Sequence, residues 1–370
     1  MRKWIFAAAL ILAPFSVAVA DPVYNTLKAG PDAVASWSTV TFQSSHTGWQ
    51  SSGLTVTKGE AVTIFADGQV QAGLPLPLDP RHYVWGRIGP DGPVFNIATD
   101  QHTFIAEQEG LLYLAAKGTG FFFEDRRGTY PPKELLGPEF PFDAKATVVI
   151  WQEDPIDSLK ALSKDPLDPF GQAHAVIVQA PSLPEGFDYL WYLGNAQVFG
   201  AYQEEGRKGI RGTTHYDFGI VKKLVDIPLT DETEISFEWL YDSLPAQGPE
   251  TEAQFHDYLS IAVEFDNGQD ITWMWSPTLQ EGLSFRCPLP WWDQRETHIV
   301  LQSGQEGLGT WHQHNRPIAE DYRRSVNVDV PKRITGVWFI NSGIFAKAKG
   351  DARFANVVIS DGGKTTNIFN

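Results

Sequence analysis

Two glutamates offer the clearest acid chemistry in the sequence. Glu238 and Glu264 each fall in a run where apolar and polar residues alternate, at 235–241 and 259–265, which is typical of strands with one buried face. We expect both carboxylates on the polar side of their strands. Glycoside hydrolysis requires two such groups about 5 to 9 Å apart, so a shared sugar groove is one interpretation. Two solvated residues on the outside of a sheet are the other.

A second group of reactive side chains lies in residues 309–324. This stretch combines an indole, two imidazoles and a guanidinium in a short loop before a predicted helix, in which Glu320 and Arg324 have the spacing of an ion pair. A structural corner without a ligand is the alternative interpretation. The spacing of the two histidines is a weak metal signal, because no third ligand is evident. The candidate carbohydrate-binding residues are Trp191, Trp292, Trp311, His312, His314 and Arg316.

His256 suggests a different enzyme chemistry. Together with a tyrosine such as Tyr258 or Tyr322 it could remove the proton beside a uronate carboxylate, as in a polysaccharide lyase, while Arg316 binds that carboxylate through two hydrogen bonds. Loop histidines are more often surface or capping residues. The catalytic candidates are thus Glu238, Glu264 and His256.

The composition excludes several classes of protein. Cys287 is the only cysteine, so the chain has no internal disulfide and its stability must come from hydrophobic core. Without the basic residues at positions 2 and 3, 27 basic residues face 45 acidic ones, a net charge of about −18. Such a surface repels nucleic acid and anionic lipid. The sequence also has no nucleophile elbow, phosphate-binding glycine loop or paired-cysteine metal motif.

The first twenty residues predict export. Residues 1–3 are Met-Arg-Lys, an apolar run follows to residue 17, and Ala-Val-Ala precedes Asp21, which is the pattern of a secretory signal peptide. We expect the mature chain to begin near Asp21 and to reside in the periplasm or outside the cell. No later run is long and apolar enough to span a bilayer.

The candidate residues require a framework of strands. Abundant glycine and proline and short alternating runs predict an all-β chain of two β-sandwich or jelly-roll domains. The predicted domains are 21–152 and 173–370, joined at 153–172 by a short Pro-rich connector that contains Asp-Pro three times. The 13 tryptophans exceed what such cores require. Exposed indoles often stack against sugars, although core packing is the better interpretation for any single one.

The turn at residues 266–270 sets the register of one predicted hairpin. A two-residue turn would pair Val263 with Thr272 and mix the polar and apolar faces. A three-residue loop pairs Val263 with Trp273 and keeps one side apolar, so we predict the longer loop.

Several motifs of the N-terminal half carry a family resemblance. Residues 58–68, the Gly-Pro-Asp-Gly turn at 89–92, residues 110–113, and Asp125 with Gly-Thr-Tyr at 128–130 resemble the family of PA-I galactophilic lectins, over about residues 49–151. The resemblance implies a small β-sandwich that binds galactose through calcium, with Asp125 and Thr129 as calcium ligands. Ala72 replaces the sugar-side tyrosine of the family and Lys133 falls near its asparagine pair, which implies a lost or altered site.

The C-terminal half carries a second resemblance. Trp311, Arg316, Asp-Tyr-Arg at 321–323, Gly-Val at 336–337 and the small-residue strand at 352–359 resemble a bacterial exported family of unknown function, domain of unknown function 3047. The resemblance covers about residues 187–360. It implies a jelly roll and no particular reaction.

The sequence as a whole predicts an exported protein that recognises a polysaccharide or oligosaccharide. Possible calcium is the one cofactor expected, and neither nucleic acid nor a membrane span is expected. A glycoside hydrolase or polysaccharide lyase in the C-terminal jelly roll is one alternative. A structural module of the cell envelope is another.

Overall fold

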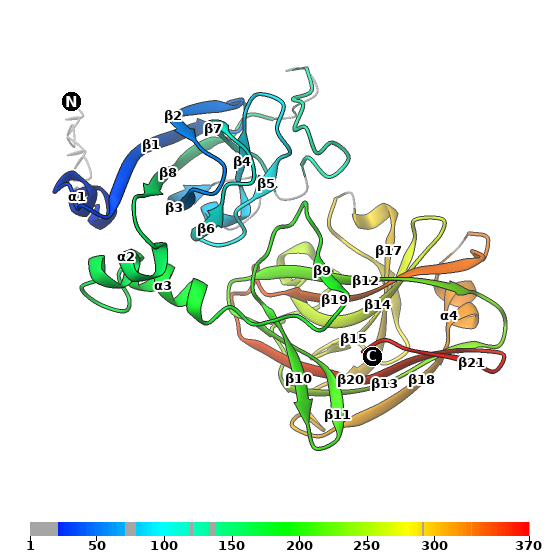
Figure 1. Ribbon diagram of the computed structural model, residues 1–370. Helices are drawn as coiled ribbons and strands as arrows, with labels where there is room; N and C mark the ends of the chain where they lie inside the picture. Colours follow the sequence, from blue (N-terminus) through cyan, green and yellow to red (C-terminus); the bar gives the residue numbers. More distant parts are fainter. Residues whose placement is uncertain are drawn as a thin grey trace, which may run out of the picture.

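The computed structural model describes residues 21–70, 79–118, 121–132, 136, 138–290, 292–326 and 328–369. Within these residues most of the chain is β-strand, arranged in four sheets with a few short helices (Figure 1). The all-β prediction is confirmed. The predicted signal peptide at 1–20 lies outside the described residues, as do Ala72 and Lys133.

The N-terminal half is a β-sandwich of two antiparallel sheets. Sheet A has the strand order β1-β8-β3-β6, and sheet B has the order β2-β7-β4-β5. Alternate side chains of these strands, such as Val62 and Ile64 of β3, form the core between the sheets. The elements are β1 (Val34–Ser44), β2 (Gln50–Val56), β3 (Ala61–Val70), η1 (Pro80–His82), β4 (Val84–Ile88), β5 (Phe95–Asn96), β6 (Gln101–Ile105), β7 (Gly110–Ala116) and β8 (Pro141–Trp151).

Three short helices pack on the N-terminal sandwich. Each begins at a proline, and the preceding aspartate accepts a backbone N–H as the N-cap. Leu159 and Phe170 from these helices share an apolar cluster with Phe65 of sheet A. Two of the Asp-Pro pairs in the predicted connector are therefore helix starts, and this segment packs on sheet A. The helices are α1 (Pro22–Lys28), α2 (Pro155–Leu162) and α3 (Pro169–Val178).

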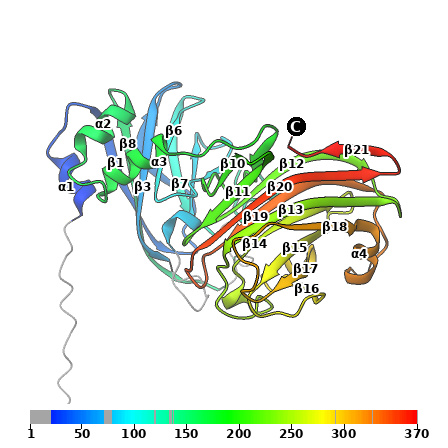
Figure 2. The same cartoon turned by 90° about the horizontal axis from the view of Figure 1, so that it is seen from below.

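The C-terminal half is a larger sandwich. Sheet C has the order β16-β17-β15-β14-β19-β12-β9, and sheet D has the order β10-β11-β20-β13-β18 with β21 beside β20 (Figure 2). The elements are β9 (Phe187–Tyr189), β10 (Phe199–Glu204), β11 (Arg207–Thr214), β12 (Phe218–Pro228), β13 (Thr233–Ser243), η3 (Ala253–Phe255), β14 (Tyr258–Phe265), β15 (Asp270–Ser276), β16 (Ser284–Arg286), η4 (Trp292–Gln294), β17 (Glu296–Ser303), β18 (His312–Pro317), α4 (Ile318–Ser325), β19 (Arg333–Ser342), β20 (Gly350–Asp361) and β21 (Lys364–Asn367).

The hairpin between β14 and β15 keeps its predicted faces but not its predicted register. The backbone N–H of Phe265 donates to the carbonyl of Gln269 at 2.9 Å, which leaves a loop of three residues. Val263 then pairs with Ile271, and Ile261 pairs with Trp273. The prediction that Val263 pairs with Trp273 is therefore wrong by two residues, a shift that leaves every side chain on its expected side.

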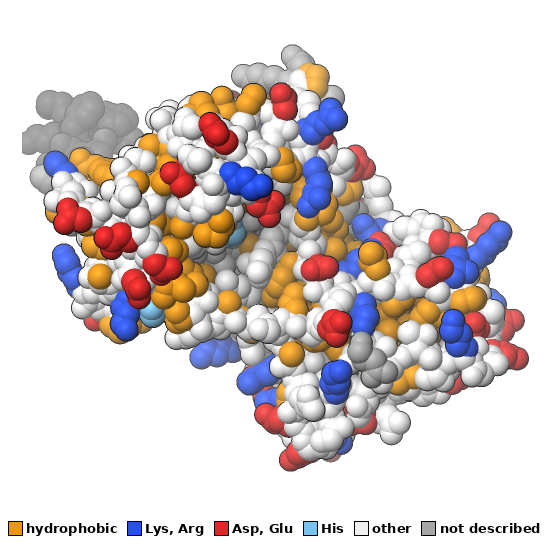
Figure 3. Space-filling model, in the orientation of Figure 1, with side chains coloured by type: hydrophobic (Ala, Val, Ile, Leu, Met, Phe, Trp, Pro, Cys, Tyr) orange, Lys and Arg blue, Asp and Glu red, His pale blue; other side chains and the backbone are white. Residues whose placement is uncertain are grey.

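The two sandwiches share an apolar contact. Trp85 and Phe122 of the N-terminal half belong to one buried cluster with Tyr192 and Trp338 of the C-terminal half. An ion pair accompanies it, because Arg81 Nη1 lies 2.9 Å from Asp217 Oδ1. Figure 3 shows the hollow between the two lobes, with apolar side chains along it. Within the described residues, no helix combines the length and the apolar character needed to cross a membrane.

Candidate functional site

The structure does not bring Glu238 and Glu264 together. Glu238 lies on β13 of sheet D and Glu264 on β14 of sheet C, and these strands are in different sheets. Their apolar neighbours, including Phe237 and Val263, both point into the core between the sheets. The two carboxylates therefore lie on opposite outer faces of the sandwich. The groove predicted for this pair is not formed, because alternation fixes the side of a strand that a residue occupies but not the sheet.

The outer face of sheet D carries an aromatic and charged group of side chains, which we call the sheet D face. It consists of Tyr202 on β10, Arg207 on β11, Glu238 on β13, Trp311 just before β18, and Asn356 on β20. The Tyr202 and Trp311 ring centroids lie 5.9 Å apart. The guanidinium carbon of Arg207 lies 4.7 Å from the Trp311 ring centroid. Side chains from four strands and from the segment before β18 thus converge on one surface, in which Tyr202 is only 9% exposed.

Strand pairing places these residues in register. Tyr202 pairs with Gly209, Gly209 pairs with Ala355, and Ala355 pairs with Glu238, so Tyr202 and Glu238 lie in one row across the sheet. Glu238 in turn pairs with Gln313 of β18. Because side chains in one row of a sheet point the same way, this row has an aromatic group at one end and hydrogen-bonding groups at the other.

Glu238 is held in its charged form. Arg207 Nε donates to its Oε2 at 2.6 Å, and Asn356 Nδ2 donates to its Oε1 at 3.0 Å. Burial opposes the charge, but the hydrogen bonds from Asn356 and Arg207 outweigh it and lower the pKa of Glu238. A carboxylate in this state accepts hydrogen bonds and is a poor proton donor.

The corner at residues 309–324 is largely structural. Arg316 binds Asp321 through both Nε and Nη2, at 2.9 and 2.5 Å, and the indole of Trp273 also donates to Asp321 at 2.9 Å. Asp321 is buried. The guanidinium that was predicted to hold a uronate is therefore already engaged by a carboxylate within the chain. Arg324 lies 3.0 Å from Asp321 in place of the ion pair predicted with Glu320.

The two histidines of this corner pack inward. The His314 ring lies 4.4 Å from the Trp239 ring, and burial lowers the pKa of His314 to about 4. The His312 ring contacts Trp275 at 5.2 Å, and its Nε2 lies 2.9 Å from the Gly307 carbonyl oxygen. The candidate sugar ligands of the corner are thus reduced to Trp311, which is half-buried on the sheet D face.

The outer face of sheet C is largely covered. Glu264 pairs there with Lys222 and, at 3.1 Å, with Arg295, and all three side chains are 20% exposed or less. The Arg295 guanidinium carbon lies 5.2 and 5.6 Å from the rings of Trp338 and Trp292. Trp292 is therefore part of the cover over sheet C.

Trp191 lies where the sandwiches meet. Its ring is 4.9 Å from the guanidinium carbon of Arg126, which belongs to the N-terminal half. Arg126 also lines a neighbouring pocket of about 310 Å³ whose aromatic wall includes Phe95, His102 and Phe104. Trp191 thus contacts the other sandwich and is not part of the sheet D face.

His256 is buried in a compact polar cluster. Its Nε2 lies 3.3 Å from the sulfur of Cys287, and Glu296 and His298 complete a group whose ligand atoms all lie within 4.8 Å of one another. Tyr258 donates to Glu296 at 3.0 Å. Because these side chains are buried, His256 and Tyr258 do not meet a polysaccharide in this structure, which argues against the lyase arrangement.

The turn that resembles a calcium site is satisfied within the protein. The Asp125 carboxylate accepts backbone N–H groups of Arg127 at 2.8 Å and Thr129 at 2.9 Å. The hydrogen bonds from Thr129 and Arg127 lower the pKa of Asp125. Among the described residues, Asp125 does not belong to a cluster of three or more His, Cys, Asp or Glu side chains. Calcium at Asp125 and Thr129 stays a prediction.

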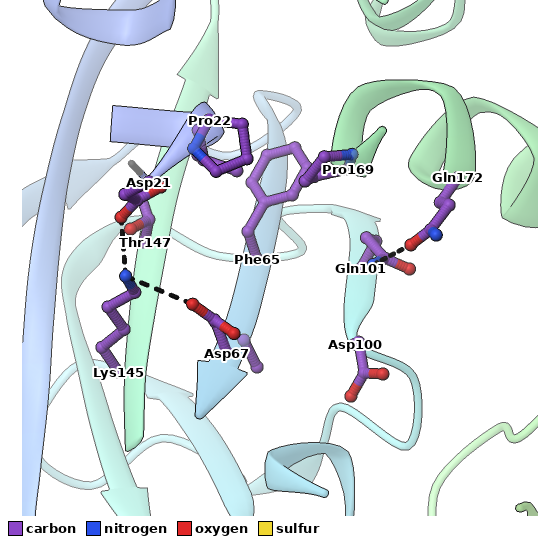
Figure 4. Close-up of a pocket in the computed structure, with 12 residues that line it drawn as sticks. Asp21, Pro22, Phe65, Asp67, Asp100, Gln101, Lys145, Thr147, Pro169 and Gln172 are labelled. Carbon is purple, nitrogen blue, oxygen red and sulfur yellow. Dashed lines mark hydrogen bonds and ion pairs between the residues drawn. The ribbon is translucent and has the colours of Figure 1, made fainter. Parts of the chain in front are cut away.

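A further pocket lies between α1, α3 and sheet A. It has a volume of about 550 Å³ and is lined by residues including Phe65, Asp67 and Lys145 (Figure 4). Lys145 is held between Asp21 at 2.7 Å and Asp67 at 3.2 Å. The ammonium group of this pocket is therefore neutralised by its own surroundings.

Sequence reasoning missed several residues of both polar groups. Tyr202, Arg207 and Asn356 complete the sheet D face, yet they are close to Glu238 only through strand pairing. Glu296 and His298 alternate on β17, a signal that was available in the sequence. Their partners Cys287 and His256 come from other segments, so the cluster requires the fold.

The comparisons with known proteins bear on the C-terminal half. Residues 193–358 match the family described as Protein of unknown function (DUF3047). The C-terminal resemblance is confirmed over this segment, which is somewhat less than half of the chain. A search of curated proteins finds no match. The lectin resemblance of the N-terminal half stays a prediction.

Solved structures show only remote similarity. One is the xyloglucanase domain of NopAA, a type three effector from Sinorhizobium fredii, in complex with cellobiose, with 9% identity and a TM-score of 0.28 over 50% of this chain and 100% of that one. Another is the catalytic domain of Humicola grisea Cel12A, with 6% identity and a TM-score of 0.26 over 44% and 85%. A third is the tandem CBM22 domain of Paenibacillus barcinonensis Xyn10C, with 11% identity and a TM-score of 0.23 over 89% and 94%. Scores this low carry no argument about function.

Proposed function

We propose that this chain is an exported carbohydrate-binding protein and that its C-terminal sandwich binds a polysaccharide on the sheet D face. The observation that supports it most is the pairing of Trp311 and Tyr202 beside the Arg207, Glu238 and Asn356 network. An aromatic ring presents an apolar surface to the C–H face of a sugar, and the neighbouring polar groups can bind its hydroxyls.

The charges of this surface favour a neutral glycan. Arg207 pairs with Glu238, and two further arginines of the same outer face pair with aspartates, Arg211 with Asp351 at 2.5 Å and Arg353 with Asp242 at 2.5 Å. Since each of these cations already has an anionic partner, a uronate would have to displace one. We therefore propose a neutral polysaccharide.

The same geometry favours binding over cleavage. Glycoside hydrolysis needs two carboxyl groups about 5 to 9.5 Å apart. The cross-strand neighbours of Glu238 are Gln313 and Ala355. Along its own strand, Glu234 and Asp242 are each four residues away, which corresponds to about 13 Å. Glu205 is nearer, because Arg207 Nη1 lies 3.9 Å from Glu205 Oε2 and Arg207 Nε lies 2.6 Å from Glu238 Oε2. Both of these carboxylates pair with the same guanidinium, and the lowered pKa of Glu238 makes it a poor general acid, so the pair favours binding.

Binding can be measured by affinity electrophoresis in gels that contain neutral or uronate polysaccharides. We expect retardation by at least one neutral polymer, and Trp311→Ala should weaken it by about tenfold or more, equivalent to about 1.4 kcal/mol. Trp37→Ala is the matched control, because Trp37 is also half-buried but packs on Tyr24 of the N-terminal half.

Two results would contradict the proposal. One is the absence of binding to every polymer of the panel, and the other is equal binding by the Trp311→Ala and wild-type proteins. Reducing ends and the absorbance of unsaturated products, measured in the same incubations, test for hydrolase and lyase activity, and we expect neither.

Export is the second part of the proposal. Its support is the basic, apolar and small-residue pattern of positions 1–20. Expression in a bacterial host followed by fractionation and N-terminal sequencing tests it. We expect a mature chain that begins near Asp21 outside the cytoplasm, and an intact Met1 on cytoplasmic protein would contradict it.

A further inference from the structure

Four potential metal ligands meet beneath the outer surface of sheet C. His256 precedes β14, Cys287 follows β16, and Glu296 and His298 alternate on β17. One ligand atom from each lies within 4.8 Å of the other three, and the four side chains are buried. This arrangement concerns a different face of the sandwich from the sheet D face and does not depend on carbohydrate binding.

The spacing of the atoms fits tetrahedral coordination. Zinc binds nitrogen and oxygen at about 2.0 to 2.2 Å and sulfur at about 2.3 Å, so neighbouring ligands in a tetrahedron are about 3.4 to 3.6 Å apart. His256 Nε2 lies 3.3 Å from Cys287 Sγ. His298 Nε2 lies 3.5 Å from Glu296 Oε1. Both distances are close to the separation expected between two ligands of a tetrahedral site.

The buried ring of His298 lacks a hydrogen-bond partner among the described residues. Its side chain is 0% exposed, and neither ring nitrogen has a hydrogen-bond partner among the described residues, since the 3.5 Å approach of Nε2 to Glu296 does not have hydrogen-bond geometry. A neutral imidazole carries one N–H donor and one lone pair. Burying both without partners is unfavourable, and a metal ion would take up the lone pair.

The surrounding groups orient the other ligands. His256 Nδ1 lies 2.6 Å from the Glu250 carbonyl oxygen, so the N–H is on Nδ1 and the lone pair of Nε2 faces Cys287. Tyr258 and Thr272 donate to Glu296 at 3.0 and 3.2 Å. Hydrogen bonds of this kind fix the tautomer and orientation of metal ligands.

We propose that His256, Cys287, Glu296 and His298 form a closed structural site for a divalent transition metal, with zinc as the expected ion. A thiolate and a carboxylate together balance its two positive charges, which suits a buried site. Four protein ligands leave no position for a substrate. The ion would join the loop before β14 and the end of β16 to β17.

The wild-type protein, prepared without an affinity tag, provides the first test. We expect close to one zinc per chain by inductively coupled plasma mass spectrometry. After the metal is removed with a chelator, Co²⁺ should give the visible absorption of tetrahedral cobalt and a near-ultraviolet thiolate-to-cobalt charge-transfer band. Protein that holds no metal and gives no charge-transfer band with Co²⁺ overturns the proposal, whatever happens to any variant.

Variants assign the ligands. Cys287→Ser should abolish the charge-transfer band, and His298→Gln should weaken metal binding by more than about a hundredfold, beyond the range of outer-shell effects. His102→Gln is the matched control, because His102 packs on Phe95 in the other sandwich and should leave the metal content unchanged. Stoichiometric metal in folded Cys287→Ser protein overturns the assignment. Polysaccharide binding is measured in parallel, so that failure of the proposed function is separately visible.

Discussion

The two outer faces of the C-terminal sandwich use similar residues in opposite ways. On sheet D, the polar residues of β13 alternate with buried ones and remain partly exposed. On sheet C, β15 is buried on both sides and β14 is buried except at Glu264. The outer face of sheet D is therefore a surface that a ligand can reach, whereas the central strands β14 and β15 of sheet C form an internal layer.

The difference lies in what covers each face. Trp85 and Phe122 of the N-terminal half pack with Tyr192 and Leu193 over the strands of sheet C, in one apolar cluster with Trp338. The same cover encloses polar side chains that an open face would leave in water, including Asp270 and His298. Buried polar and charged groups need partners inside the protein. Glu264 has them in Lys222 and Arg295, whereas neither ring nitrogen of His298 has a hydrogen-bond partner among the described residues.

The largest effect that would distinguish the faces is the loss of a carboxylate charge. Glu264→Gln should lower the free energy of unfolding by about 2 to 3 kcal/mol, because it removes the anion that Lys222 and Arg295 share in a mostly buried site. Glu238→Gln should lower it by about 1 kcal/mol or less, since Glu238 pairs with one cation on the open face. Urea unfolding monitored by tryptophan fluorescence measures both.

This matched pair also separates stability from binding. Glu264→Gln should leave polysaccharide affinity at the wild-type level, whereas Glu238→Gln should weaken it. Equal losses of unfolding free energy in the two variants would contradict the proposed difference in burial between the faces. A binding defect confined to Glu264→Gln would indicate that the polysaccharide binds on sheet C and not on sheet D.

A smaller effect should come from His82, which lines a pocket between the two sandwiches. Burial, reinforced by the charge of Arg81, lowers the pKa of His82 from 6.5 to about 4. The unfolded chain therefore binds more protons between these values, so this contribution is present above about pH 6.5 and is lost as the pH falls towards 4. We expect the loss of this contribution to lower the free energy of unfolding by about 1 to 2 kcal/mol at pH 5.

Urea unfolding at pH 7.5 and pH 5 measures this contribution. The difference in unfolding free energy between the two pH values should be smaller in His82→Gln than in wild type. His215→Gln serves as the control, because His215 is exposed. If His82→Gln and wild type lose the same free energy on acidification, the covered interface does not keep His82 neutral.

Local patterns predicted the strands better than their partners. The alternation at 235–241 identified β13 and its buried side, and the faces of β14 were also as predicted. The hairpin loop has the predicted three residues, but the predicted register was wrong by two, because a pair of Val263 with Trp273 would leave five residues, 266–270, in the loop. Assignment of Glu238 and Glu264 to different sheets depends on β13 pairing with β20 and β14 with β19, contacts that are distant in sequence.

The candidate sites show the same limit more strongly. Trp311 was recognised by residue type, but Tyr202 and Arg207 join it only because β10 and β11 are added to the edge of sheet D. Arg316 was recognised as a carboxylate-binding group, and it does bind one, although the carboxylate is the buried Asp321 of the same chain. Residue chemistry was thus predictable, whereas the partner of each group was set by tertiary structure.

The smallest expected effect is that of Arg324→Ala, at the Asp321 carboxylate that an exposed and a half-buried arginine share. Arg324 is 52% exposed and Arg316 is 24% exposed. Arg324→Ala should change the free energy of unfolding by about 0.5 kcal/mol or less, because solvent screens its attraction to Asp321. Arg316→Ala should cost about 2 to 3 kcal/mol, since it removes a two-point hydrogen bond to a buried anion. If the corner supports only the fold, both variants should bind polysaccharide as the wild-type protein does. A binding defect in folded Arg316→Ala that is absent from Arg324→Ala would instead indicate that Arg316 contacts the ligand.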